Sequence, residues 1–328
     1  MPITSVTKDT DALTMTVVSE FSVPVQRLWD AYADPRQLEK FWGPVEWPAT
    51  FTRHDFYPGG RSHYWMTGPD GTRAAGYWEY LSMEPGRSFE VTDAFADEAG
   101  TPNPEMPMMR MSLVFDETAQ GSRLTTTTWF NSQEDYQQLL EMGLEEGMTS
   151  AMGQMDAVLE DLSSFAAGTG VQTQVLTDTK VRISRIIRGT PDQVREAHRD
   201  PDLLRRWLLG PDGWRMSDCQ VATKVGDRYR FAWEKEEDGS EGFALYGELI
   251  ELDEPYREVT TESMEGVPGA PNINEQTLTP IAGGTLLTLI ITYPSAEVRD
   301  MVLETGMTDG METSYARLEQ VLTASSRN

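Results

Sequence analysis

The chain has 328 residues, which is more than one ordinary domain needs and favours two compact units. It carries 27 Lys and Arg against 53 Asp and Glu, a net charge of −26, so charge repulsion disfavours nucleic acid and anionic membranes as partners. A single cysteine, Cys219, excludes an internal disulfide, and with three histidines we expect neither a metal site nor a cofactor. We find no secretory signal and no long apolar run, and we expect a cytoplasmic protein.

The first predicted elements are a strand and two short helices. Alternating apolar residues over Leu13–Phe21 predict the strand, and Ser22-Val-Pro24 offers a capping hydroxyl and an early proline for the first helix. An antiparallel meander follows, because short segments of period-two character are separated by Gly, Pro and Asp turns. Its predicted strands are Gly60–Met66, Tyr77–Leu81, Ser88–Thr92, Met108–Phe115 and Leu124–Phe130.

One long helix closes this series. Ser132 can cap it, and Met148, Met152 and Met155 recur at helical spacing. Small residues at Gly143, Gly147 and Ala151 form a stripe on the same helix. This stripe serves either close packing on the sheet or the volume of a cavity.

The whole series then occurs a second time. The Asp-Pro block at Asp34–Phe41 is matched at Asp200–Trp207, and Gly59–Met66 is matched at Gly226–Trp233. Three further blocks match in the same order: Glu84–Arg87 with Glu254–Arg257, Gly121–Leu124 with Gly283–Leu286, and Met142–Leu159 with Thr305–Leu322. Chance similarity does not persist in order over five blocks, so we predict an internal duplication.

The stretch between the two copies is small and polar, which is typical of a linker. We therefore predict a first domain over residues 1–162, a linker over 163–174 and a second domain over 175–328. Two copies in one chain can replace the dimer that a single-domain protein would form, so we expect a monomer.

This layout resembles the helix-grip fold of the START/birch-pollen-allergen (SRPBCC) superfamily. The Asp-Pro-x-x-Leu-x-x-Phe/Trp blocks, the Gly-Gly/Asp-Arg strand entries and the Gly-x-x-x-Gly-Met helices at Gly143–Met148 and Gly306–Met311 are similar to the branch named after the activator of the heat-shock-protein ATPase. The resemblance implies an α+β fold of two tandem helix-grip domains. In each, a curved antiparallel sheet wraps around a long carboxy-terminal helix, with two short helices after the first strand.

The resemblance also implies a cavity between sheet and helix, which relatives use for apolar small molecules. Some relatives serve bacterial polyketide pathways as cyclases or aromatases, and others bind a reactive enediyne. We therefore expect binding of a hydrophobic or aromatic small molecule of polyketide, polyene or enediyne type. If the two cavities meet, one elongated site would hold a linear chain. The alternatives are a polyketide cyclase or aromatase, and a co-chaperone-like protein-binding module.

Strand alternation and residue type select the candidate ligand-binding side chains. Methionine is polarizable and adapts to irregular apolar ligands, and aromatic residues at inward positions suit the same role. Matching Thr125 and Thr127 to Leu287 and Leu289 places hydroxyls inside the first copy, unless the strand faces are inverted. The candidates are Tyr64, Met66, Trp78, Tyr80, Met109, Met111, Thr125, Thr127, Trp129, Gly147, Met148 and Met152 in the first copy, and Tyr229, Phe231, Trp233, Leu287, Leu289 and Met311 in the second.

Catalytic candidates are few. His63 follows a glycine turn and Arg110 lies within the methionine-rich strand, so either can supply a polar group to the cavity. Cys219 has no base that the sequence pairs with it, and no glycine-rich phosphate loop is present. Binding is therefore favoured over turnover.

Overall fold

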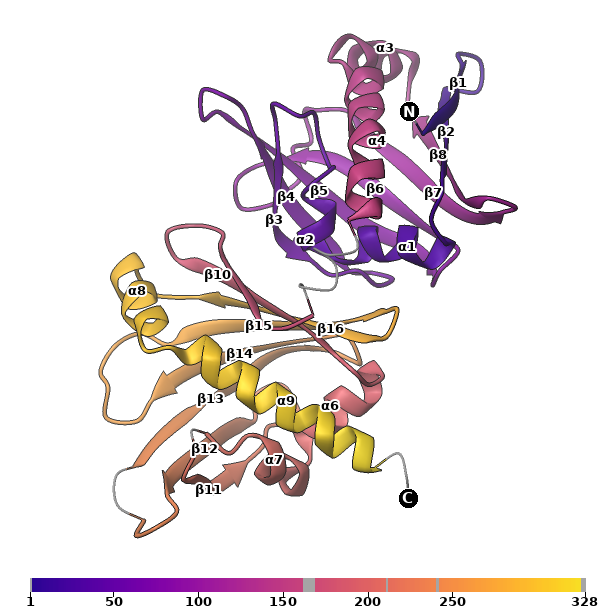
Figure 1. Cartoon of the computed structure of the whole chain (residues 1–328). Coiled ribbons are helices and arrows are strands. Elements are labelled where there is room, and N and C mark those ends of the chain that lie inside the picture. The colour runs from indigo at the N-terminus through magenta and orange to yellow at the C-terminus, as the bar shows by residue number, and fades with distance from the viewer. Residues whose placement is uncertain (1, 162–168, 211, 240–241, 326–328) are drawn as a thin grey trace. The chain divides into compact units, whose positions relative to one another are not determined.

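The computed structural model describes residues 2–161, 169–210, 212–239 and 242–325. The chain divides into two compact units, Met1–Ser163 and Ser164–Asn328 (Figure 1). Each unit is an antiparallel sheet with helices, which confirms the α+β class and the tandem arrangement. Residues 163–168 of the predicted linker lie outside the described residues, and residues 172–174 lie in the first strand of the second unit.

The first unit holds an eight-stranded sheet with the order β1-β2-β8-β7-β6-β5-β4-β3, so the meander is closed by pairing of β2 with β8. Its elements are β1 (Ile3–Asp9), β2 (Thr14–Phe21), α1 (Val25–Ala33), α2 (Pro35–Leu38), β3 (Ala49–His54), β4 (Arg61–Thr67), β5 (Arg73–Glu84), β6 (Ser88–Ala96), β7 (Met108–Thr118), β8 (Gly121–Phe130), α3 (Gln133–Glu141) and α4 (Leu144–Glu160).

The second unit repeats this plan with the order β11-β12-β13-β14-β15-β16-β10-β9. Its elements are β9 (Gln172–Val175), β10 (Lys180–Ile187), α6 (Pro191–Arg199), α7 (Pro201–Trp207), β11 (Trp214–Gln220), β12 (Arg228–Lys235), β13 (Gly242–Asp253), β14 (Arg257–Met264), β15 (Asn272–Ile281), β16 (Gly284–Thr292), α8 (Ala296–Glu304) and α9 (Met307–Ser325).

Short polar side chains begin the small helices. The carboxylates of Asp34 and Asp200 accept hydrogen bonds from backbone N–H groups of α2 and α7, and a proline follows each of them at the first helical position. Thr190 forms a capping box at the start of α6. The prediction for Ser22 was wrong, because α1 begins at Val25 with Pro24 at the N-cap position, and no side chain among the described residues caps it.

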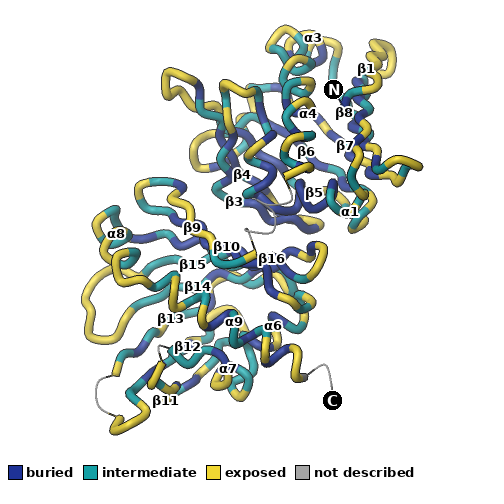
Figure 2. The backbone as a smooth tube through the Cα atoms, in the orientation of Figure 1, coloured by how far each residue is buried: buried dark blue, intermediate teal, exposed yellow. Residues whose placement is uncertain are grey.

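The closing helix of each unit is broken once. Ser132 caps α3 as predicted, but Gly143 has a φ of +89° and Gly306 a φ of +74°, and these left-handed residues end α3 and α8. The chain then restarts as α4 and α9. In Figure 1 each of these two helices lies across one face of the sheet of its own unit. The buried positions in Figure 2 follow the strands and the helix faces turned toward them.

Candidate functional site

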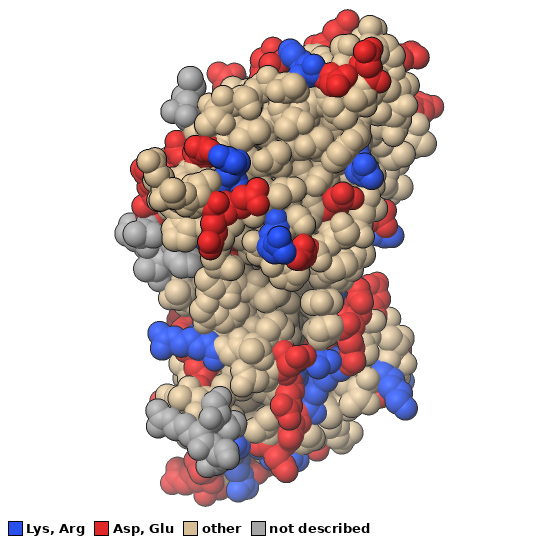
Figure 3. Space-filling model, turned by 90° about the vertical axis from the view of Figure 1, so that its right-hand side faces the viewer, with Lys and Arg blue, Asp and Glu red and all other residues tan. Residues whose placement is uncertain are grey.

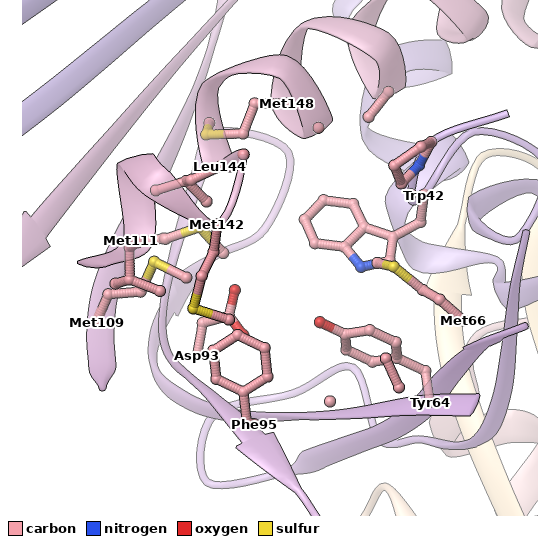
Figure 4. A pocket seen from close by; sticks show the side chains of 18 of the residues that line it. Trp42, Tyr64, Met66, Asp93, Phe95, Met109, Met111, Met142, Leu144 and Met148 are labelled. Carbon is pink, nitrogen blue, oxygen red and sulfur yellow. The ribbon is translucent and has the colours of Figure 1, made fainter. Parts of the chain in front are cut away.

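The first unit contains a cavity of about 260 Å³ between the inner face of its sheet and helix α4. Its wall is mostly apolar. It includes the aromatic residues Tyr32, Trp42, Tyr64 and Phe95 and the methionines Met66, Met109, Met111, Met142, Met148 and Met152. In Figure 4, Met109 and Met111 of β7, together with Met142 and Met148 at and beyond the end of α3, lie across the cavity from Trp42 and Tyr64. The exposed Met142 contributes to the rim, with 50% of its surface accessible.

Side-chain size on two neighbouring strands distinguishes the two units here. In the first unit Met66 on β4 pairs with Ala74 on β5. The corresponding pair in the second unit is Trp233 and Phe243, whose rings stack with centroids 4.8 Å apart. Two large rings therefore fill a volume that a methionine and an alanine leave open in the first unit.

Tyr64 is positioned by a glycine opposite it. Tyr64 pairs with Gly76 across β4 and β5, and a Cβ built at Gly76 would lie 2.2 Å from the phenol ring. Phe51 stacks against the same ring with centroids 4.9 Å apart. The ring is thus held against bare backbone, and in Figure 4 its hydroxyl points into the cavity.

Asp93 on β6 is the acidic residue of the cavity wall. Only 7% of its surface is exposed. Burial raises the pKa of its carboxyl to about 7, although the nearby Trp78 indole N–H and the Ala94 backbone N–H favour the anion. Asp93 in turn raises the pKa of Tyr64, which burial already places well above its ordinary value. Figure 4 shows the carboxyl and the phenol hydroxyl directed toward the same part of the cavity.

The predicted binding residues outside β8 fall into three groups. Those that line the cavity are Tyr64, Met66, Met109, Met111, Gly147, Met148 and Met152. Trp78 and Tyr80 are fully buried behind the wall: Trp78 packs edge-on against Trp42, and the Tyr80 hydroxyl is hydrogen-bonded to Ser62 at 3.1 Å. In the second unit, Trp233 and Leu287 belong to the hydrophobic core, and Phe231, Leu289 and Met311 pack against it. Tyr229 is also buried there, and its hydroxyl donates to the backbone of β14.

The predicted face of β8 was wrong. Thr125, Thr127 and Trp129 are only half-buried and lie on the outer face, whereas Thr126 lines the cavity and Thr128 is fully buried. The side chains of Thr125, Thr127 and Trp129 therefore cannot reach a ligand in the cavity.

The cause is a slip of one residue in matching the two copies. Gly121 corresponds to Gly284 and not to Gly283, since a Cβ at either position would lie 2.1 Å from a carbonyl oxygen of the neighbouring strand. A shift of one residue moves every side chain of a strand to the opposite face. With the corrected match, Thr126 is the counterpart of Leu289.

The two catalytic candidates also lie on the outer face. Arg110 stacks on Trp129 with its guanidinium carbon 4.4 Å from the ring centroid. His63 stacks on Tyr77 with centroids 5.6 Å apart. The prediction that either group faces the cavity was wrong, because both occupy the outward phase of strands whose neighbouring residues point inward.

His54 is buried within the first unit and is held at both ring nitrogens. Its Nε2 donates to the backbone carbonyl of Tyr32 at 2.9 Å, so Nδ1 accepts from the Ser62 hydroxyl at 3.0 Å. The imidazole is therefore a structural group that ties β3 to α1.

Sequence reasoning missed Trp42 and Asp93 as cavity residues. Trp42 follows α2 in a segment without periodicity, so no pattern could place it. Asp93 had a usable signal, because it continues the inward phase set by the buried Phe89 and Val91. An acidic residue in the inward phase of a buried strand is unusual and merits attention.

Comparison with known proteins identifies the fold family. Residues 22–160 and 188–323 each match the family described as activator of Hsp90 ATPase homolog 1-like protein. The chain belongs to this family. None of the curated proteins compared with the chain matches it.

Solved structures similar to the chain each correspond to about half of it. A protein from Mycobacterium smegmatis is 48% identical, with 49% of this chain and 98% of that chain covered and a TM-score of 0.46. A protein from Arthrobacter aurescens is 44% identical, with 48% and 92% covered and a TM-score of 0.47. An AHSA1-like protein from Aeromonas hydrophila is 20% identical, with 43% and 93% covered and a TM-score of 0.36.

The described residues also bear on three other kinds of site: a basic surface patch, a membrane-spanning helix and a metal site. On the face shown in Figure 3, Lys and Arg side chains occur singly among Asp and Glu, and those described there form no basic patch. In the described parts of the chain, no helix is long and apolar enough to cross a membrane. Within those same parts, no three His, Cys, Asp or Glu side chains gather as a metal site.

Proposed function

We propose that the first unit binds a hydrophobic or aromatic small molecule, of polyketide, polyene or enediyne type, in the cavity between its sheet and α4. The observation that carries the proposal is the cavity itself. At about 260 Å³ it is close to the lower end of the range of about 300–1,000 Å³ that is typical of small-molecule sites. Its lining of aromatic rings and methionines around one carboxyl also fits that description.

Gly147 of α4 supports the interpretation that the cavity is kept open for a ligand. A Cβ built at this position meets no atom of the described residues within 4 Å, so close packing on the sheet does not explain the glycine. A glycine inside a helix costs about 1 kcal/mol relative to alanine. A glycine that lines the cavity with nothing against it is consistent with room kept for a ligand.

The test is native mass spectrometry of the full chain as purified, followed by a thermal-shift screen with polyenes, aromatic polyketides and fatty acids. We expect a co-purifying apolar mass or a Tm that rises with ligand concentration, as mass action requires. The control carries Met66→Trp and Ala74→Phe, the pair that the second unit uses at these positions, and it should lose the response. If the unmodified chain shows no bound mass and no shift, the proposal fails and a protein-binding role is favoured.

A second candidate function is that of a polyketide cyclase or aromatase, and Asp93 is the observation that favours it. A carboxyl with a pKa of about 7 in an apolar cavity is suited to proton transfer near neutral pH. This role predicts that Asp93→Asn lowers turnover of a poly-β-ketone by about 10²–10⁴-fold while the substrate still binds. Equal turnover in Asp93→Asn and the unmodified chain would exclude Asp93 as the acid–base group.

A further inference from the structure

Asp93 is the only charged side chain among the described residues that line the cavity. None of those residues is a lysine, arginine or histidine, and the causes that shift the pKa of Asp93 include no cation. A carboxylate buried without a cation is unfavourable, since the Coulomb energy of a countercharge is missing. The wall therefore provides a carboxyl that is ionised in part near neutral pH, and no cation among the described lining residues is available to pair with its anion.

The second unit has a carboxyl at the same place with a different neighbour. On β6, Val91 pairs with Tyr80, and on β14 the corresponding residue Thr260 pairs with Leu249. An acid lies two residues further along each strand, so Asp93 and Glu262 occupy equivalent positions. Burial raises the pKa of Glu262, and a hydrogen bond with Asn274 favours its anion.

The position of Asn274 is taken by a methionine in the first unit. Asn274 pairs with Thr260, and the residue that pairs with Val91 is Met111. A thioether cannot donate a hydrogen bond to a carboxylate. The first unit thus keeps the acid but lacks the amide, and it has the open cavity in front of the acid.

Aromatic rings stand around this carboxyl. Trp42, Tyr64 and Phe95 surround the part of the cavity toward which Asp93 points in Figure 4. The faces of such rings attract organic cations within about 6 Å of the ring centroid. Because Gly76 and Phe51 cover the Tyr64 ring, the rings left for such a contact are those of Trp42 and Phe95. A carboxylate and aromatic rings in one apolar pocket favour the same kind of ligand group.

We infer that the cavity takes an apolar molecule that carries one amine, with the ammonium group placed at Asp93 and the apolar body against the methionines. This inference rests on the proposed binding function and names the charge of its ligand. A ligand carboxylate is disfavoured by repulsion once Asp93 is ionised, and a neutral alcohol gains only a hydrogen bond there.

The inference predicts a pH dependence with a defined sign. Because burial raises the pKa of Asp93 to about 7, the attractive carboxylate predominates above that pH and is lost below it. The other titratable groups that line the cavity are the phenols of Tyr32 and Tyr64, both with pKa values raised by burial, so they stay neutral in this range. The inward residues of β5, β7 and α4 that line the cavity carry no charge.

The experiment measures binding of 1-octylamine, 1-octanol and octanoate, which share one alkyl chain, to the full chain by calorimetry at about pH 8 and about pH 5.5. We expect octylamine to bind at least tenfold more tightly than octanol at the higher pH and this preference to disappear at the lower pH. Asp93→Asn should abolish the preference and keep octanol binding. Glu262→Gln, which changes the equivalent acid of the second unit, should leave it intact.

Two results would overturn the inference in distinguishable ways. If octanol binds and octylamine binds no more tightly at either pH, the cavity is a ligand site but the amine inference is wrong. If none of the three compounds binds, the proposed function fails together with the inference. The comparison of the two pH values needs no variant, so it holds even if Asp93→Asn does not fold.

Discussion

Two glycines of the cavity wall should respond in opposite directions to the same substitution. Gly76 lies under the Tyr64 ring, where a new Cβ would be 2.2 Å from a ring carbon. Gly147 lines the same cavity from α4, where a new Cβ meets no atom within 4 Å in the part of the chain that the structure describes. Because both changes add one methyl group, the surroundings alone decide the sign.

The magnitudes follow from these contacts. Phe51 and Trp42 flank the Tyr64 ring, so it cannot move away freely, and overpacking of this kind costs about 1–3 kcal/mol. Replacing a strand glycine with alanine returns about 0.5–1 kcal/mol, which leaves Gly76→Ala destabilising by about 1 kcal/mol at the centre of the range and about 2.5 kcal/mol at its upper end. Gly147→Ala should stabilise the first unit by about 1 kcal/mol through helix propensity.

The assay is urea unfolding of the full chain followed by tryptophan fluorescence, with thermal unfolding as a second readout. A change of 1 kcal/mol corresponds to about 2–4 °C in Tm for a unit of this size. Tyr64→Leu should relieve the contact, so Gly76→Ala becomes neutral or stabilising in that background, with a coupling energy of about 1–3 kcal/mol. Equal stability of Gly76→Ala and the unmodified chain, or no rescue by Tyr64→Leu, would show that the ring does not lie on the glycine.

Four further predictions concern single groups of the first unit. Burial raises the pKa of Asp93 from 3.8 to about 7, so the free energy of unfolding should fall by up to about 4 kcal/mol as the pH rises between these two values. Asp93→Asn should flatten this pH dependence in urea midpoints measured at several pH values. Thr128→Val should stabilise by about 1–3 kcal/mol in the same assay, because its buried hydroxyl has no hydrogen-bond partner among the described residues. Ser62→Ala should destabilise by about 1–3 kcal/mol, since a buried imidazole nitrogen loses its donor, and an unchanged midpoint would contradict that bond. His63→Ala and Arg110→Ala should leave the affinity for cavity ligands unchanged in calorimetry, and a marked loss would show that the outer face takes part in binding.

The duplication, the meander and the small helices could be predicted from the sequence because each depends on nearby residues. In an Asp-Pro pair the aspartate caps a helix and the proline is its first residue, so Asp34 and Asp200 predict the starts of α2 and α7. Alternation over Arg228–Trp233 identifies a strand and its inward residues in the second copy. Matching this strand to Gly59–Met66 transfers the inward phase to Tyr64 and Met66, and the structure places both in the cavity wall. These are rules of period and capping that hold whatever packs against the element.

Which face of β8 points inward was decided by pairing across strands. A match between Gly121 and the wrong one of two adjacent glycines reverses the face of every residue that follows it, and the sequence offers two glycines at 283 and 284. Only the close approach of a neighbouring carbonyl to the glycine fixes the register.

The cavity and its charge likewise depend on tertiary contacts. Met66 and Ala74 lie on opposite strands of a hairpin, as do Trp233 and Phe243. Only strand pairing shows that the first pair leaves open a volume that the second pair fills. Asp93 acquires its raised pKa from the rings and methionines that remove it from water, and these come from several elements far apart in the chain. Local sequence determined which elements form, whereas volume and desolvation, which sum over all neighbours in space, were decided by the tertiary structure.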